Sequence, residues 1–257
     1  MKKFFNKFKI NNYTYLFFLI CMLCGYLKNI SIIFLICIIH EFGHIFFSYI
    51  FKYEIISIEI LPFGGFTTTN KLINSNINKD ILVNFGGIFF QLILFIFLFI
   101  FKDLFNQITY NLFIMYNLIL LLFNLIPIIP LDGNNIIHLL LEKYFSFKFS
   151  YYLNFFLSFI LLFLFLIINY IFNIDNYFII SFLLYKMVEY IKNYKYINNR
   201  FLLERYLYDL DYKKIDNHTY DVKDLKKEVL HFFKEENRYI KENKKIENIL
   251  YINKDTN

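Results

Sequence analysis

Six long apolar stretches constrain the fold of this chain more than any other feature of its sequence. They cover residues 10–27, 30–51, 81–101, 110–129, 149–172 and 177–194. A helix needs about 20 apolar residues to cross the hydrocarbon core of a bilayer, and each stretch approaches that length. With 58% hydrophobic and 23% aromatic residues, the chain has more apolar surface than a soluble domain of 257 residues could bury. The sequence therefore predicts an all-α polytopic membrane protein with about six transmembrane helices.

The basic residues between these stretches predict the orientation of the chain in the bilayer. Lysines gather before the first stretch, between the second and third, between the fourth and fifth, and after the sixth, whereas the opposite loops hold only Lys28 and Lys102. Cytoplasmic loops carry an excess of Lys and Arg, so both termini are expected in the cytoplasm. The net charge of +6 is explained by this bias, and no nucleic-acid partner is expected.

Composition changes near residue 195 and divides the chain into two predicted domains. Residues 1–195 form a six-span membrane domain, and residues 196–257 form a charged cytosolic tail that keeps helical periodicity in places. Between the second and third spans, residues 52–69 alternate as strands do around a Pro-Phe-Gly-Gly turn, which predicts a small β-hairpin. The exposed edge of such a hairpin can pair with an extended peptide, and an ordinary hairpin loop is the alternative.

The second apolar stretch contains the segment His40-Glu41-Phe42-Gly43-His44 and no other charged side chain. Ionisable groups at membrane depth are costly, so a cluster of three needs a physical reason. Histidines at positions i and i+4 share one face of a helix, where both imidazoles can reach one metal ion. Glu41 lies next to that face and can touch a metal-bound water. The pattern predicts a metal centre inside a membrane span.

A catalytic zinc usually has three protein ligands and one open position, so a third ligand must come from elsewhere in the chain. The fourth apolar stretch ends in the segment 124–133, where Pro127 and Pro130 break the helix. Irregular backbone at membrane depth is tolerated where it is buried in protein or lines a wet cavity. This break carries Asp132, the predicted third ligand. His138 is the rival ligand, and a helix N-cap is the alternative role for Asp132.

These two segments, in this order, resemble the site-2 protease family of intramembrane zinc metalloproteases (peptidase M50), and within it the stage IV sporulation protein FB group. The resemblance rests on residues 40–44 and 124–133, with weaker support from residues 62–65, 86–91 and 200–206. The chain departs from the family pattern at Gly87 and Gln91, where Pro and Asn are common. Its charged tail is too short for the nucleotide-sensing domain of some members.

The resemblance implies a zinc metalloendopeptidase with one Zn²⁺ per chain, held by His40, His44 and Asp132. Glu41 would then be the general base that takes a proton from the zinc-bound water and returns it to the leaving amine. The resemblance also implies that Asn124 helps to hold the substrate backbone. Three further residues are assigned to substrate binding with it, namely Pro127, Gly64 and Gly65.

The resemblance further implies regulated intramembrane proteolysis of a membrane-associated sigma-factor precursor during sporulation. The expected partners are that protein substrate, inhibitory membrane proteins and the lipid bilayer. The expected location is the bacterial cell membrane or the membrane around a forespore. One alternative is a site-2-type protease that cuts an anti-sigma factor or a remnant signal peptide. Another, of a different class, is a metal-binding transporter or scaffold without proteolytic activity.

Overall fold

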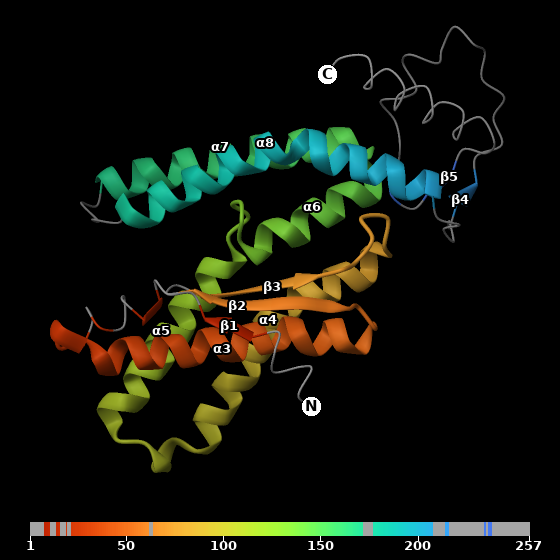
Figure 1. Ribbon diagram of the computed structural model, residues 1–257. Helices are drawn as coiled ribbons and strands as arrows, with labels where there is room; N and C mark the ends of the chain where they lie inside the picture. The colour runs from red at the N-terminus through yellow and green to blue at the C-terminus, as the bar shows by residue number, and fades with distance from the viewer. Residues whose placement is uncertain are drawn as a thin grey trace, which may run out of the picture. The chain divides into compact units, whose positions relative to one another are not determined.

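The computed structural model describes residues 8–10, 14, 15, 19, 22–61, 64–171, 177–207, 214, 215, 234, 236 and 237 (Figure 1). This part of the chain is mostly helical. Its helices are α3 (Leu27–Ile50), α4 (Ile77–Ile100), α5 (Gln107–Leu125), α6 (Asp132–Tyr144), α7 (Phe147–Ile171) and α8 (Tyr177–Leu207), with a 3₁₀ turn at Lys102–Leu104. Its strands are β1 (Phe8–Ile10), β2 (Ile55–Leu61), β3 (Gly64–Thr69), β4 (Lys214–Ile215) and β5 (Glu236–Asn237).

Four of the described helices are long and apolar enough to cross a membrane. They are α3, α4, α5 and the Phe147–Ile168 part of α7. Eight of the 18 residues of the first predicted span, residues 10–27, lie outside the described residues. The sixth predicted span differs from expectation, because α8 carries Lys186, Glu189 and Lys192 within it and is not among these candidates. Charges near the centre of a span oppose insertion, which explains the difference.

The fourth span ends earlier than its hydropathy predicts. Helix α5 stops at Leu125, and Ile126 already has extended backbone angles, with φ −67° and ψ 129°. The residue before a proline avoids the helical region, because the proline ring would clash with its backbone, so Pro127 sets this boundary. The prediction that prolines break the chain here is confirmed, four residues before the predicted end of the apolar stretch at residue 129.

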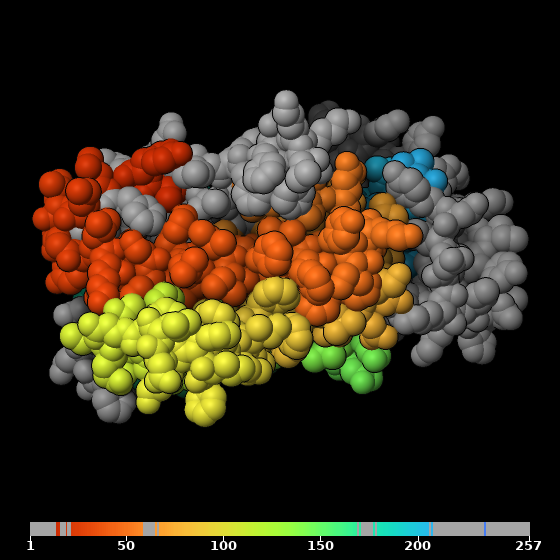
Figure 2. Space-filling view, turned by 90° about the horizontal axis from the view of Figure 1, so that it is seen from below, coloured from red at the N-terminus to blue at the C-terminus, as the bar shows by residue number. Residues whose placement is uncertain are grey.

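The chain forms two compact units, of which the first comprises Met1–Lys71 and Ile81–Ile126. Its sheet has the order β1-β2-β3, with β1 parallel to β2 and β2 antiparallel to β3. The predicted β-hairpin between the second and third spans is thereby confirmed. Helices α3 and α5 pack against each other, as Figure 2 shows, and the core of the unit is built from five buried side chains, Ile32, Ile36, Leu94, Leu98 and Phe113.

Large apolar side chains cover the outside of this first unit. On α3 they include Leu35, Ile38 and Phe42, and on α5 they include Met115 and Leu122. Soluble monomers rarely expose contiguous apolar surface of this kind, because contact with water is unfavourable there. Lipid chains are a suitable environment for such a surface.

The second compact unit comprises Leu72–Asp80 and Pro127–Asn257. Its helices α6 and α7 pack together, as do α7 and α8. The rings of Phe147 and Phe201 stack with their centroids 4.0 Å apart, and Leu202, Ile73 and Ile197 pack around them. Helix α8 runs without a break past residue 195, where the composition of the chain changes.

Candidate metal centre

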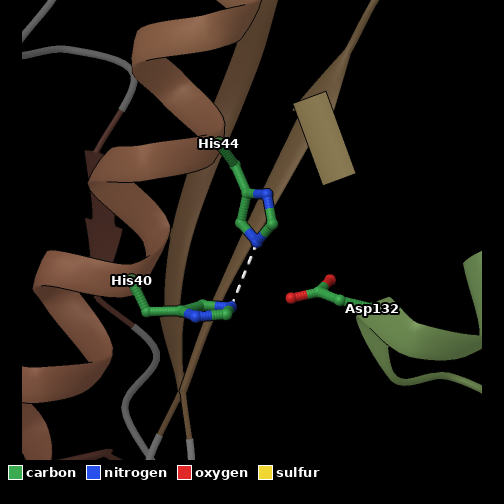
Figure 3. A group of neighbouring side chains, drawn as sticks. All are labelled: His40, His44 and Asp132. Carbon is green, nitrogen blue, oxygen red and sulfur yellow. Dashed lines mark hydrogen bonds between the residues drawn. The ribbon is translucent and has the colours of Figure 1, made fainter. Parts of the chain in front are cut away.

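Two histidines on α3 form the centre of the candidate site. His40 and His44 lie one turn apart, and their Nε2 atoms face each other across 3.1 Å (Figure 3). The rings meet edge to face, with centroids 4.8 Å apart and an interplanar angle of 81°. The predicted i and i+4 arrangement on one helical face is therefore present in the structure.

The outer nitrogen of each imidazole has a partner on α4. His44 Nδ1 lies 2.8 Å from the carbonyl oxygen of Val83, and His40 Nδ1 lies 3.1 Å from the side-chain oxygen of Gln91. A carbonyl oxygen only accepts hydrogen bonds, so the proton of each neutral imidazole belongs on Nδ1. Each Nε2 then carries a lone pair directed at the other histidine. This is the tautomer that a metal-binding histidine needs.

The spacing of the two Nε2 atoms fits a tetrahedral metal ion. Zinc–nitrogen bonds of about 2.0–2.1 Å at the tetrahedral angle place two ligand nitrogens about 3.3 Å apart, close to the 3.1 Å between His40 and His44. Two lone pairs at this distance repel each other unless a cation or a proton lies between them. The donor set therefore suits a divalent cation such as Zn²⁺.

Close packing of α3 on α4 depends on glycines. A Cβ atom on Gly43 would overlap the backbone of Gly86, and a Cβ atom on Gly87 would overlap the ring of His40. Any larger residue at these positions would push the two helices apart. Because Val83 and Gln91 lie on α4, this close approach also brings the partners of both imidazoles within reach.

Glu41 lies beside the hairpin. Its Oε2 atom accepts a hydrogen bond of 3.0 Å from the hydroxyl of Thr67 on β3. Gly65 on the same strand packs directly on the Glu41 side chain, since a Cβ atom there would overlap the side-chain carbons. Strand β3 pairs with β2 on one side only in the described sheet. The carboxylate that sequence analysis assigns as general base is thus fixed next to an edge strand.

Sequence analysis did not assign roles to several residues that support the histidines. Gln91 and Asn117 are both fully buried, and the side-chain amide of Asn117 donates to the backbone oxygen of Gln91 at 3.1 Å. This contact joins α5 to α4, the helix whose Gln91 side chain lies beside His40. Gln91 and Asn117 are polar residues inside apolar spans, and that signal could have indicated their importance.

The remaining predicted site residues lie around the helix break. Asp132, also drawn in Figure 3, is the first residue of α6, and the N-cap is Leu131, with no side-chain cap hydrogen bond. The structure thus assigns the N-cap position to Leu131 and the first helical position to Asp132. Asn124 is half-buried in the last turn of α5, and Pro127 follows that helix.

His138, the rival metal ligand, packs inside the second unit. Its ring lies edge to face against Tyr151 and Tyr190, with centroids 5.9 and 6.3 Å away. Its Nε2 atom lies 3.7 Å from Glu142. Burial lowers the pKa of His138 from its ordinary 6.5, an effect that Glu142 opposes and Lys234 reinforces. These neighbours describe a packed histidine in the helix that follows Asp132.

Comparison with known proteins agrees with the fold. The profile of peptidase family M50 matches residues 29–109. Stage IV sporulation protein FB of Bacillus subtilis (strain 168) is 29% identical over 207 residues, which cover 78% of this chain and 71% of that protein. The site-2 protease from Methanocaldococcus jannaschii has a similar fold, with a TM-score of 0.54 at 22% identity, over 71% of this chain and 89% of that one.

The profile match covers the histidine pair, Glu41, the hairpin and the helix that positions the imidazoles. Over residues 29–109 the chain therefore resembles M50 family metallopeptidases, and four of its described helices are candidate membrane spans. Similarity to this family favours zinc as the metal.

Proposed function

We propose that this metallopeptidase processes a membrane-associated sigma-factor precursor during sporulation. The observation that carries the proposal is the pair of imidazoles whose outer nitrogens are engaged and whose Nε2 atoms face each other. The likeness to a stage IV sporulation protein supports the choice of substrate.

The proposed zinc ligands are His40, His44 and Asp132. The two histidines contribute neutral nitrogen donors, and an aspartate completes a common set of three protein ligands with one position left for water. Asp132 begins a helix straight after a proline-broken segment, and the N-cap position of that helix is Leu131. One Zn²⁺ bound there would lower the pKa of its water towards neutrality and polarise the peptide carbonyl.

Glu41 is the proposed general base and then the general acid. It takes a proton from the attacking water and delivers that proton to the leaving amine as the peptide bond breaks. The hydrogen bond from Thr67 and the packing of Gly65 keep the carboxylate in one orientation. A base that is already held in place needs less free energy to reach the reactive geometry, which raises the rate.

The substrate is proposed to bind as an extended chain along β3. An edge strand offers unpaired backbone donors and acceptors, and a peptide that pairs with them is held in register. Gly64 and Gly65 begin this strand, and Gly65 lies next to Glu41. Asn124 and Pro127, which flank the end of α5, are proposed to contact the same substrate.

The proposed location is the bacterial cell membrane or the membrane around a forespore. In the proposed topology, both termini lie in the cytoplasm. The excess of Lys on alternate loops supports this orientation. The division into a membrane domain, residues 1–195, and a charged tail, residues 196–257, stays a prediction. Inhibitory membrane proteins remain proposed partners.

Co-expression of the chain with a sigma-factor precursor tests this function. Wild type should shorten the precursor, and Glu41→Gln should abolish cleavage while zinc content stays at one ion per chain. Loss of a general base lowers rates by about 10²–10⁴-fold. Full cleavage by purified Glu41→Gln would refute the role of Glu41. If an anti-sigma factor or a remnant signal peptide is cleaved instead, the protease stands and the substrate proposal is wrong.

A further inference from the structure

A buried lysine from the C-terminal segment lies between two buried carboxylates. Lys234 Nζ is 3.2 Å from Asp80 Oδ2 and 3.2 Å from Glu142 Oε2. The exposed fractions of the three side chains are 4%, 0% and 3%. Charged residues are almost never buried this completely unless they are paired, so the cluster is a specific contact.

The cluster connects three segments that are far apart in the sequence. Asp80 lies in the first turn of α4, Glu142 lies near the end of α6, and Lys234 belongs to the predicted charged tail, residues 196–257. Ser75 donates a hydrogen bond of 2.7 Å to Asp80, and His138 faces Glu142. All of these residues belong to the second compact unit.

Removal of the lysine would take away the positive charge that lies 3.2 Å from both buried carboxylates. The transfer of a charge out of water is costly, and only close opposite charges and hydrogen bonds offset that cost. The two acids would then repel each other and attract water, which would separate the start of α4 from α6. Lys234 is thus the group that holds these two helices together at this point.

Both helices carry residues of the proposed metal centre. Asp80 precedes Val83 by three residues, and the carbonyl oxygen of Val83 accepts the hydrogen bond that orients His44. Glu142 lies on the helix that begins with Asp132. A displacement of the first turn of α4 would therefore reach His44, and a displacement of α6 would reach Asp132.

We propose that Lys234 is a positioning residue of the protease. A residue of the charged tail would then support the geometry of the metal centre. The inference rests on the proposed roles of His44 and Asp132 as zinc ligands. Lys234 acts through its charge, by neutralising Asp80 and Glu142. Its loss should loosen the metal and slow the chemical step without changing the surface that binds substrate.

The first experiment compares Lys234→Met with Lys234→Arg in the full chain, with Lys143→Met as control. Lys143 neighbours Glu142 in sequence but is exposed. Lys234→Met should release zinc to a chelator at least about tenfold faster, as loss of a supporting group does at other metal centres. It should also lower kcat and leave KM unchanged. Lys234→Arg should restore most of both properties, and Lys143→Met should match wild type.

The second experiment covers a failure of Lys234→Met to fold. The triple variant Asp80→Asn, Glu142→Gln, Lys234→Met carries no charge that needs compensation, so it should fold and hold zinc better than Lys234→Met. A triple variant as defective as the single one would overturn the proposal, as would a Lys234→Met protein with normal zinc release and kcat. If the wild-type protein binds no zinc, the proposed function itself is wrong. A defect in zinc binding or kcat that is confined to the variants would leave the proposed function intact.

Discussion

The two compact units treat their buried polar groups in opposite ways. In the first unit, His40 and His44 direct two lone pairs at each other. In the second unit, Lys234 neutralises Asp80 and Glu142. The first arrangement needs an added cation, whereas the second already contains one. The buried polar groups of the first unit are therefore arranged to bind an external ion, whereas the charges of the second unit neutralise one another and have a structural role.

The same contrast holds for hydrogen bonds to backbone groups. In the first unit, a backbone carbonyl orients His44 for a metal. In the second unit, Glu204 of α8 accepts hydrogen bonds from the backbone nitrogens of Ile73 and Asn74 at 2.6 and 3.2 Å and pairs with Arg200 at 3.0 Å. These bonds use the lone pairs of Glu204 to fix the loop before α4. Variants in the two units should accordingly affect different measurements.

The largest effect is expected for His44→Ala. Loss of one of three protein ligands should reduce bound zinc below one-tenth of the wild-type content and abolish cleavage, because the metal would lose both affinity and geometry. Zinc analysis of the purified protein checks this. His138→Ala is the matched control, since His138 packs among tyrosines and should leave zinc content unchanged. A wild-type zinc content in His44→Ala would contradict the view that the histidine pair of the first unit binds the metal.

The next effect is expected for Glu204→Ala. Glu204 is 5% exposed and accepts two backbone hydrogen bonds, so its loss should reduce the free energy of unfolding by about 3 kcal/mol. Thermal unfolding in detergent measures this change. Glu189→Ala removes a partly exposed pair with Lys186 and should cost less than about 1 kcal/mol. An equal loss of unfolding free energy in both variants would mean that the buried Glu204 contacts contribute no more to stability than the Lys186–Glu189 pair.

The sequence predicts those features that depend on local patterns. The i and i+4 spacing of His40 and His44 places both on one face of a helix, and prolines mark the end of α5. The hairpin follows from alternation and from a glycine-containing turn. Each of these features is set within about ten consecutive residues, where periodicity and backbone restriction are informative.

Contacts between distant segments could not be predicted in this way. Lys234 meets Asp80 across 154 positions, and Thr67 meets Glu41 across 26. Nothing in the local composition of the tail distinguishes Lys234 from the other lysines there. The predicted span over residues 177–194 also differs, since apolar length alone did not account for the three charges within that stretch of α8. Packing decides such features, and it is not encoded in short sequence windows.

A smaller effect is expected for Gln91→Leu. The change removes the oxygen 3.1 Å from His40 Nδ1 and retains a side chain of similar volume. The imidazole would lose the contact that fixes its tautomer, and zinc affinity should fall about 10–100-fold. Chelator competition measures the affinity. Leu92→Ala, at an exposed position of the same helix, is the control and should bind zinc normally. Unchanged zinc affinity in Gln91→Leu would show that the hydrogen bond between His44 and the Val83 carbonyl is sufficient to orient the histidine pair.

The smallest effect is a pH dependence of stability that arises in the second unit. Burial lowers the pKa of His138 below its ordinary 6.5, so the folded protein binds that proton more weakly than the unfolded chain. Stability from this group is complete above pH 6.5 and is lost as the pH falls below it, by at most about 1.4 kcal/mol per pH unit. Unfolding of wild type and His138→Asn between pH 7.5 and 5.5 gives the difference. The variant should have the flatter profile, whereas parallel profiles would show that His138 is accessible to protons in the folded protein.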